Sequence, residues 1–433
     1  MVSDLYLKDF VDRKAMEEIQ LKRLRDTLER VYQKSEFYKQ AFDRIRVKPS
    51  DLKKLSDLAK FPFTQKTDLR NHYPYGLIVV PMKDIVRIHA SSGTTGKPTV
   101  VAYTKQDINN WAETVCRAFA TDGVTENDII QVAYGYGLFT GGFGAHYGAE
   151  KLGAAVVPMG GGSTQKQLML IQDFKSSVIC CTPSFFIHVI EEAEKMGLDL
   201  HNTQLRKGFF GAEPWTENMR QYIEKHTNIE AYDIYGLSEI TGPGVSVDCP
   251  AHAGLHIFED HYYPEIVDPK TGEVKAPGEE GELVFTTITK EGMPLIRYRT
   301  HDITRLHYEK CDCGRTLVRM DKVNQRSDDM LIIRGVNLFP TQIESVLLSV
   351  KGTEPHYQLF VTREGALDQL EVKVEITPLV FDDEVKTLET LRTEIKLKIK
   401  QLIGLNAKIT LVEPGTIERS SGKAKRVIDL RQK

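Results

Sequence analysis

Apolar residues in the first part of the chain recur every three or four positions. Leu21, Leu24, Leu28 and Val31 follow this spacing within the segment 16–42, where Lys, Arg and Glu fill many of the remaining positions. Such spacing places the apolar side chains on one face of a helix and the charged ones on the other. The pattern therefore predicts an amphipathic helical region over these residues.

The spacing changes between residues 84 and 104. An apolar run over 85–90 is followed by a loop rich in Ser, Gly and Thr, and then by a β-branched run over 99–103. Short runs of this kind, bounded by turn-forming residues, are typical of strands. We therefore predict a strand, a loop and a second strand.

The middle of the chain alternates between short apolar runs and longer helical patterns. The apolar runs cover 129–133, 154–158 and 178–182, and helical patterns cover 163–174 and 183–195. Strands that alternate with helices in this way are typical of an α/β protein. We therefore predict an α/β fold for this region.

The pattern becomes richer in strands after residue 257. Strand-like runs bounded by Pro and Gly dominate the segment 257–306, including 281–287, and indicate a β-rich subdomain. Beyond residue 329, helical patterns over 340–349 and 383–403 flank an alternating strand over 370–376. This last stretch predicts a small α+β domain of about a hundred residues. A chain of 433 residues is too long for one ordinary core, so a large domain with a smaller one is expected.

The composition is that of a soluble globular protein, with 41% hydrophobic and 27% charged residues. The 57 Lys and Arg nearly balance the 60 Asp and Glu, which leaves a formal net charge of -3. No overall field therefore attracts nucleic acid or anionic lipid, and small molecules are the expected partners. The sequence contains neither a recognisable signal peptide nor a transmembrane pattern, so we expect a cytoplasmic protein with reduced cysteines and no membrane partner.

The loop between the first two predicted strands has the composition of a phosphate-binding loop. Its glycines let the backbone approach an anion, and its hydroxyl, amide and lysine groups can donate hydrogen bonds to that anion. It differs from the NTPase P-loop, because two residues separate its glycines, Pro98 replaces the metal-binding hydroxyl and a strand follows. A polar hairpin turn is the alternative. The residues assigned to the loop are Ser91, Ser92, Gly93, Thr94, Thr95, Gly96 and Lys97.

Four motifs in this order resemble those of the adenylate-forming superfamily, whose members activate carboxylates as acyl-AMP. After the phosphate loop, the segment 211–215 resembles the one that borders adenine, and 235–239 resembles the one whose glutamate helps to place Mg²⁺. The segment 298–302 resembles the motif whose aspartate holds the ribose hydroxyls, a task that suits a carboxylate. The resemblance implies ATP or AMP binding by Gly211, Ala212, Glu213, Pro214, Asp233, Tyr235, Gly236 and Asp302, and a catalytic role for Glu239.

A further motif marks a hinge between domains. Residues 326–329 resemble the hinge of the superfamily, which implies that Arg326 lies near the ribose and that Asp328 is the pivot. The implied fold is α/β: a large adenylation domain of several subdomains over 1–327, with helices flanking its sheets, and a small mobile α+β domain over 328–433.

The segment 420–426 alone is typical of a solvated basic tail. The resemblance instead makes Lys423 the catalytic lysine of the superfamily. An ammonium group would stabilise the negative charge that develops as the carboxylate joins the α-phosphate of ATP.

Over nearly its whole length the sequence resembles the phenylacetate–coenzyme A ligase family, notably across 133–142 and 330–344. This resemblance implies an acid–thiol ligase that forms acyl-AMP from phenylacetate or a similar aryl acid and then the coenzyme A thioester, releasing pyrophosphate and AMP. ATP, Mg²⁺ and coenzyme A are the implied cofactors, and a homodimer through the N-terminal helix is compatible with the resemblance.

A glycine-rich aromatic segment suits a flat apolar acid. Its assigned pocket residues are Tyr134, Tyr136, Phe139 and Gly141, for which ordinary core packing is the alternative.

Four Cys and His residues form a candidate metal site. Cys311 and Cys313 have the close spacing of a metal knuckle, and Cys249 with His256 could complete a tetrahedral zinc site of structural type. His252 is an alternative ligand, and a core histidine is the alternative interpretation of His256.

Two other functions compete with the ligase. One is a non-catalytic nucleotide or acyl sensor on the same scaffold, which would have no need of Lys423. The other is an adenylating enzyme for a different acid. Nucleic-acid binding would depend on the basic tail alone, and is not expected.

Overall fold

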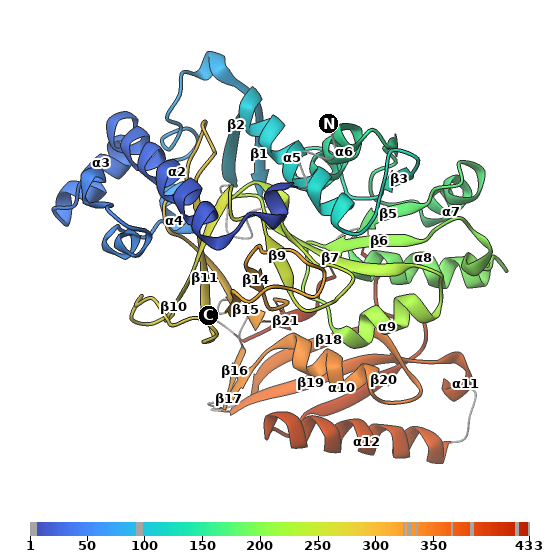
Figure 1. The fold of residues 1–433 in the computed structure, drawn as a ribbon. Helices are drawn as coiled ribbons and strands as arrows, with labels where there is room; N and C mark the ends of the chain where they lie inside the picture. Colours follow the sequence, from blue (N-terminus) through green and yellow to red (C-terminus); the bar gives the residue numbers. More distant parts are fainter. Residues whose placement is uncertain are drawn as a thin grey trace. The chain divides into compact units, whose positions relative to one another are not determined.

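Figure 1 shows the fold in a computed structural model of the chain. The structure describes residues 7–91, 98–323, 325–326, 331–334, 336–364, 367–381, 385–420 and 424–431. The chain forms two compact units. Unit 1 comprises Met1–Cys181, Thr203–Ala212 and Glu230–Val323, and unit 2 comprises Thr182–Asn202, Glu213–Ile229 and Asn324–Lys433.

The mixed α/β fold with a large N-terminal and a small C-terminal part is confirmed. The domain boundary between residues 327 and 328 stays a prediction. Among the described residues, no helix is long and apolar enough to span a membrane.

The helices and the first strands of unit 1 frame its largest sheet. Its helices are α2 (Arg13–Lys34), α3 (Glu36–Arg44), α4 (Lys66–Asn71), α5 (Lys105–Thr121), α6 (Gly141–Leu152) and α7 (Thr164–Asp173), preceded by the short 3-10 helix η1 (Leu7–Phe10). Its strands are β1 (Ile85–Ser91), β2 (Thr99–Thr104), β3 (Ile129–Val132), β4 (Ala155–Val157), β5 (Val178–Cys181), β6 (Lys207–Gly211), β7 (Glu230–Leu237), β8 (Gly242–Val247), β9 (Leu255–Ile257), β10 (Tyr262–Val267), β11 (Gly281–Thr287), β12 (Tyr298–Thr304), β13 (Leu306–His307) and β14 (Arg319–Met320).

Nine of these strands form one sheet in the order β13-β14-β9-β8-β7-β6-β5-β3-β4. The strands β4, β3, β5, β6 and β7 are parallel, which agrees with the strand–helix alternation of the sequence. From β7 onwards the pairing is antiparallel, through β8, β9, β14 and β13. The sheet therefore changes from parallel to antiparallel at β7, the strand that carries Asp233, Tyr235 and Gly236.

The predicted N-terminal helical region consists of two helices, α2 and α3, because Ser35 interrupts it. Ser35 has an extended backbone, its NH donates to Val31, and its hydroxyl accepts from the NH of Tyr38. It thus ends α2 and caps the start of α3, as a serine at an N-cap commonly does. The two strands predicted over 85–90 and 99–103 are confirmed as the antiparallel pair β1 and β2.

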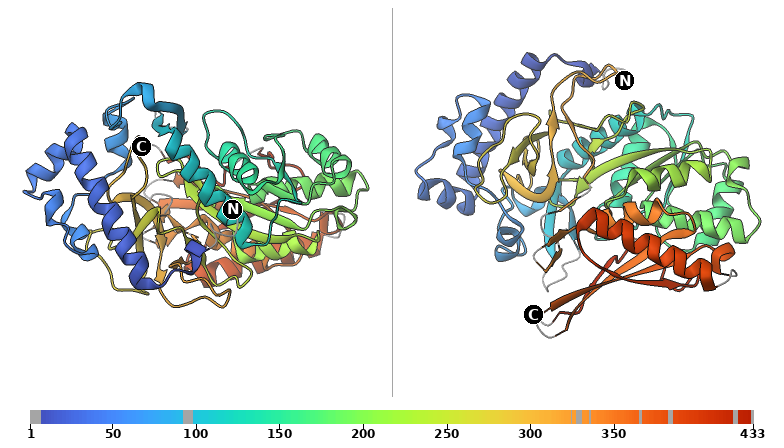
Figure 2. Two further views of the ribbon diagram at one scale, coloured as in Figure 1. Left: turned by 45° about the horizontal axis from the view of Figure 1, so that its top comes forward. Right: turned by 90° about the horizontal axis from the view of Figure 1, so that it is seen from below.

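Unit 2 is built around a four-stranded sheet in the order β20-β19-β18-β21. Its strands are β15 (Gln325–Arg326), β16 (Leu331–Ile333), β17 (Val336–Leu338), β18 (Thr353–Glu364), β19 (Leu367–Ile376), β20 (Lys408–Val412) and β21 (Val427–Asp429). Its helices are α8 (Pro183–Lys195), α9 (Glu217–Lys225), α10 (Pro340–Leu348), α11 (Pro378–Phe381) and α12 (Val385–Ile403). Helices α10 and α12 pack on one face of this sheet, as Figure 2 shows, and Ile343, Leu347, Ile395 and Ile399 lie in its core.

Candidate active site

The predicted phosphate-binding loop joins β1 to β2. Only Ser91 of its assigned residues is described, at the end of β1; Ser92, Gly93, Thr94, Thr95, Gly96 and Lys97 lie outside the described residues. Ser91 pairs with Thr99 in the antiparallel register, so the two ends of the loop lie side by side. The hydroxyls of both are buried and have no hydrogen-bond partner in the described part of the chain. Such unsatisfied buried hydroxyls are uncommon in folded proteins and mark both ends of the predicted loop.

The glycine-rich aromatic segment lies against the end of β1. The NH of Ala90 donates to the carbonyl of Leu138 at 3.0 Å. Gly141 begins α6, and a Cβ there would lie 2.7 Å from the ring of Phe139, which would have to move. Tyr134 is buried beside it, whereas Phe139 is 38% exposed. The structure thus brings Tyr134, Phe139 and Gly141 together, next to the start of the phosphate loop.

Tyr136, the fourth residue assigned to the aryl pocket, contacts α6. Its hydroxyl lies 3.2 Å from Nδ1 of His146, and its ring meets Phe143 edge to face at 5.2 Å. Burial raises the pKa of the Tyr136 hydroxyl, so this group remains neutral at physiological pH. It can therefore offer a ligand both an apolar ring and a hydrogen bond.

His89 is a buried residue of this region that sequence reasoning missed. Its Nδ1 lies 3.1 Å from the Leu138 carbonyl, and its ring meets Tyr103, Trp111 and Phe143 edge to face. Burial lowers the pKa of the imidazole, which favours the neutral form with Nδ1 donating to the carbonyl. Nε2 is buried and has no partner among the described residues. A polar residue within a predicted apolar strand was the available signal.

The loop after β7, which carries Glu239, is fixed by hydrogen bonds from several elements. The hydroxyls of Thr140 and Ser238 lie 3.1 Å apart, and the Tyr103 hydroxyl donates to the Thr241 carbonyl at 2.8 Å. The Glu239 carboxylate is 3.1 Å from Nζ of Lys66 in α4. These contacts connect the glutamate motif to the aromatic segment and hence to the start of the phosphate loop.

Lys290 also binds the loop that carries Glu239. Its buried ammonium donates to the carbonyls of Glu239 at 3.1 Å and Ile240 at 2.8 Å, and lies 4.8 Å from the centre of the Tyr103 ring. Burial lowers the pKa of Lys290 to about 8, although Asp107 and Glu239 oppose the shift. Lys290 was not predicted, because its importance depends on carbonyl groups about fifty residues away.

The lowered pKa of Lys290 predicts a pH-dependent stability. Because the folded-state pKa is below the ordinary value, the unfolded chain binds the extra proton, so the cost of burying the charge is present below pH 8 and is relieved as pH rises. We expect the free energy of unfolding of wild type, measured with urea, to increase by about 2 kcal/mol relative to that of Lys290→Met between pH 8 and pH 10. Equal pH slopes for the two proteins would contradict this.

Asp302, the predicted ribose-binding carboxylate, is buried in β12 and bound to β7. The Tyr235 hydroxyl donates to its Oδ2 at 2.5 Å. Asp233, also in β7, forms an ion pair with Lys322 at 3.7 Å. Two motifs far apart in sequence are thus adjacent in unit 1, as binding of one nucleotide requires.

Gly211 and Gly236 permit close contact between backbones near this pair. A Cβ at Gly211 would lie 2.1 Å from the Ile234 carbonyl oxygen, and one at Gly236 would lie 1.7 Å from that of Gly242. Ala212, which follows Gly211, has a positive φ of 70°. The glycines of both motifs are therefore required by packing, whether or not a nucleotide contacts them.

The remaining adenylation residues belong to unit 2 and are described within it. Glu213 accepts hydrogen bonds from the NH groups of Ser184 at 2.9 Å and Ala424 at 3.0 Å. Ala424 follows Lys423, which, like Asp328, lies outside the described residues. Pro214 follows Glu213 in unit 2, and Arg326 lies in β15. In its own unit, the structure therefore joins the adenine motif to the segment after the predicted catalytic lysine.

The four predicted metal ligands converge in unit 1. Sγ of Cys249 is 3.8 Å from Sγ of Cys311, and Sγ of Cys313 is 3.3 Å from Nε2 of His256. One ligand atom from each residue lies within 4.8 Å of all the others, and none of these cysteines forms a disulfide. His252 instead bonds to Asp248 at 2.7 Å. His256 is therefore the histidine of this group.

Comparison with known proteins agrees with the arrangement of these motifs. Residues 14–289 match the model of the AMP-binding enzyme family, and residues 335–431 match that of the AMP-binding enzyme C-terminal domain. The chain therefore belongs to the AMP-binding enzymes, and within them to the phenylacetate–coenzyme A ligase family, whose members are its relatives at about half identity.

Two curated relatives and one solved structure illustrate the similarity. Phenylacetate–coenzyme A ligase of Aromatoleum evansii is 54% identical over 96% of this chain and 94% of its own. The phenylacetate–coenzyme A ligase of Escherichia coli strain K12 is 51% identical over 96% of this chain and 95% of its own. The structure of 2-hydroxyisobutyryl-CoA ligase with R3-HIB-AMP matches 98% of this chain and 91% of its own, with a TM-score of 0.92 and 29% identity.

Proposed function

We propose that this chain is an AMP-forming acid–thiol ligase that converts phenylacetate, or a similar aryl acid, to its coenzyme A thioester. The observation that carries the proposal is the connection of three motifs within unit 1. Ala90 links the end of β1 to the aromatic segment, Thr140 links that segment to Ser238 beside Glu239, and Tyr235 links β7 to Asp302. The end of β1, the segment that carries Glu239, and Asp302 are thus connected by hydrogen bonds, which supports the proposal that they serve one substrate site.

The reaction has two halves. A carboxylate oxygen of the acid attacks the α-phosphorus of ATP, the bond to the β-phosphate oxygen breaks, and pyrophosphate leaves with acyl-AMP formed. The thiol sulfur of coenzyme A then attacks the acyl carbon, loses its proton, and AMP leaves. The first half makes a poor electrophile reactive, because AMP is a far better leaving group than oxide.

The proposed roles follow the charges of each step. Lys423 stabilises the negative charge on the α-phosphate and carboxylate oxygens, and the phosphate loop from Ser91 to Lys97 binds the phosphates. Asp302 accepts from the ribose hydroxyls with Arg326 nearby, and Asp328 is the pivot of the hinge. Gly211, Ala212, Glu213, Pro214, Asp233, Tyr235 and Gly236 border the nucleotide.

Magnesium is proposed to accompany ATP. Glu239 is the carboxylate assigned to it, and this buried side chain already pairs with a cation, Lys66, at 3.1 Å. A carboxylate oxygen is a donor that Mg²⁺ prefers, and the ion, when bound, neutralises charge on the phosphates.

The aryl group is proposed to lie against Tyr134, Tyr136, Phe139 and Gly141. The absence of charged side chains from 134–145 supports an apolar acid, and the close packing at Gly141 leaves little space for a long chain. An adenylating enzyme for a different acid is the nearest alternative. His89, with an unpartnered Nε2 in the described region, is a further candidate for contact with the acid.

Zinc is proposed at Cys249, His256, Cys311 and Cys313. In a tetrahedral site with Zn–S of about 2.3 Å and Zn–N of about 2.0 Å, two sulfurs lie about 3.8 Å apart and sulfur lies about 3.5 Å from nitrogen. The observed separations of 3.8 Å and 3.3 Å support such a site. All four coordination positions are filled by protein, which is typical of a structural metal.

Pyrophosphate release from ATP tests the ligase. We expect release in the presence of one aryl acid from a panel of phenylacetate, hydroxyphenylacetates, indole acids and benzoate, with multiple turnovers only when coenzyme A is added. ATP binding without release for any acid would favour the sensor. Release with a non-aromatic acid alone would favour an adenylating enzyme of different specificity.

A further inference from the structure

The proposed metal site and the N-terminal segment meet at one loop. This loop, which we call the cysteine loop, covers residues 308–318 between β13 and β14. It carries Cys311 and Cys313, and it is folded by bonds from Cys311 NH to the Arg315 carbonyl at 3.2 Å and from Gly314 NH to the Cys311 carbonyl at 2.8 Å. The loop is thus a tight turn whose two thiols face Cys249 and His256.

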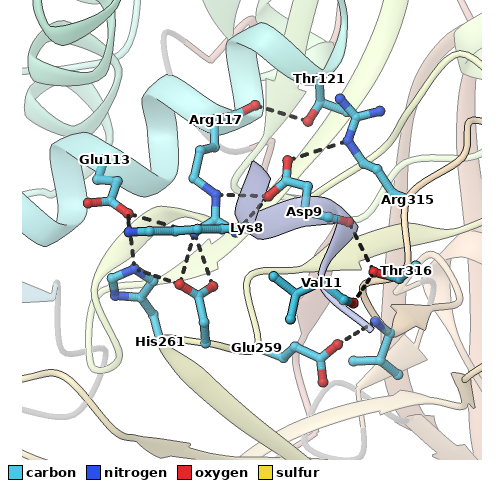
Figure 3. A network of polar contacts seen from close by, with 12 residues as sticks. Lys8, Asp9, Val11, Glu113, Arg117, Thr121, Glu259, His261, Arg315 and Thr316 are labelled. Carbon is cyan, nitrogen blue, oxygen red and sulfur yellow. Dashed lines mark hydrogen bonds and ion pairs between the residues drawn. The ribbon is translucent and has the colours of Figure 1, made fainter. Parts of the chain in front are cut away.

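The cysteine loop also binds the segment 7–13, through Arg315 and Thr316. Thr316 donates its NH to the carbonyl of Asp9 at 3.0 Å and its hydroxyl to the carbonyl of Val11 at 2.6 Å. Arg315 lies 3.4 Å from Oδ2 of Asp9 and 5.5 Å from the centre of the Phe10 ring. Figure 3 shows the contacts of Arg315 with Asp9 and of Thr316 with Asp9 and Val11.

Asp9 anchors the segment through a buried charge. Its side chain is fully buried, and its Oδ1 accepts from Nε and Nη2 of Arg117 at 2.9 and 2.6 Å. Arg117 is also fully buried and donates to Asp260 as well, so it serves two carboxylates. Arg315, at 3.4 Å from Oδ2, is a second cation beside this buried carboxylate and adds to its pairing.

We infer that metal binding by Cys249, His256, Cys311 and Cys313 holds the cysteine loop in place and thereby docks the segment 7–13 on unit 1. The inference rests on the zinc site proposed above. A metal joins the loop to Cys249 and to β9, where His256 lies, and so fixes the backbone from which Arg315 and Thr316 contact Asp9. Without the metal, the four side chains are connected by weak hydrogen bonds, such as those between Cys249 and Cys311 at 3.8 Å and between Cys313 and His256 at 3.3 Å, and the loop moves away from Asp9 more readily.

Metal content and hydrogen exchange together test the inference. Full-length protein produced with zinc in the medium is analysed by elemental mass spectrometry, and exchange is followed in peptides covering 7–13 and, as an internal control, 281–287. The comparison includes wild type before and after zinc chelation, Cys313→Ser, Asp9→Asn and Cys180→Ala. Cys180 is a buried thiol of β5 outside the metal group, so its variant controls for loss of a cysteine.

We expect about one zinc per chain in wild type, Asp9→Asn and Cys180→Ala, and none in Cys313→Ser. Exchange of 7–13 is expected to increase about tenfold in Cys313→Ser, in chelated wild type and in Asp9→Asn, with 281–287 and Cys180→Ala unchanged. Loss of zinc from Cys313→Ser without faster exchange of 7–13 would overturn the inference, and so would unchanged exchange of 7–13 in Asp9→Asn. In either case the assignment of the four metal ligands would still stand. Wild type without zinc would overturn both, whereas pyrophosphate release tests the ligase separately.

Discussion

Replacing Lys423 with alanine is expected to lower acyl-AMP formation about 10²- to 10³-fold, the usual effect of removing one group that stabilises transition-state charge. The first half-reaction gathers negative charge on the α-phosphate and the attacking carboxylate, and a positive group placed there lowers the barrier. The second half-reaction expels AMP from an acyl carbon and has no pyrophosphate to release. We therefore expect thioester formation from added acyl-AMP to remain within about threefold of wild type.

The two halves can be measured apart. Acid-dependent exchange of labelled pyrophosphate into ATP reports the first, and conversion of synthetic phenylacetyl-AMP with coenzyme A reports the second. Lys425→Ala is a matched control, because it removes an exposed lysine from the same segment. Equal losses in both assays would contradict a role confined to adenylation, and an unchanged first half would remove Lys423 from the catalytic machinery.

Local sequence patterns predicted the secondary structure well where nearby residues set the ends of a helix or strand. The helical pattern over 183–195 coincides with α8, and the strand pattern over 281–287 coincides with β11. The apolar spacing over 16–42 could not reveal the break at Ser35, because the apolar face continues through it. Nor could it give the order of the nine-stranded sheet, since pairing depends on contacts between distant residues.

Motif spacing predicted those site residues whose chemistry requires a particular residue type. Cys249, His256, Cys311 and Cys313 were selected as ligands from their types and partial spacing, and the structure brings them together. Lys290 and His89 were not predicted, because a lysine or histidine acquires its role only when burial and distant carbonyls surround it. The roles of the individual nucleotide-binding residues stay predictions.

Buried ion pairs were equally beyond the reach of sequence reasoning. Asp9, Arg117 and Asp260 are far apart along the chain and carry no motif, yet all three are buried in one network. Figure 3 shows Asp9 beside Arg117. Charged residues are mostly exposed, so a sequence offers no reason to place them in a core. The network becomes visible only when the fold brings the opposite charges together.

Replacing Arg117 with methionine is expected to lower the free energy of unfolding by about 3–5 kcal/mol at pH 7, because it leaves buried carboxylates without their partner. Arg117 donates to Asp9 at 2.6 Å and to Asp260 at 3.0 Å, and stacks over the ring of Phe258 at 4.6 Å. Methionine retains much of the apolar contact with this ring and removes the charge. Urea unfolding followed by circular dichroism measures the loss.

Changing the pH separates the charge effect from packing. Burial by itself raises the pKa of Asp260, but the charges of Arg117, His261 and Arg23 more than offset this and lower it below its usual range. A carboxylate with a lowered folded-state pKa contributes stability above its unfolded pKa, and that stability is lost as pH falls below about 4. The difference between wild type and Arg117→Met is therefore expected to shrink from pH 7 to pH 3.5.

An exposed arginine provides the control for this comparison. Arg305 has a side chain that is 40% exposed and pairs with two partly exposed carboxylates, Glu280 at 3.2 Å and Asp321 at 2.8 Å, so Arg305→Met is expected to change stability by about 1 kcal/mol or less. A deficit for Arg117→Met that stays constant with pH would assign the effect to packing. A deficit as small as that of Arg305→Met would show that the buried carboxylates find other partners or bind protons at little cost.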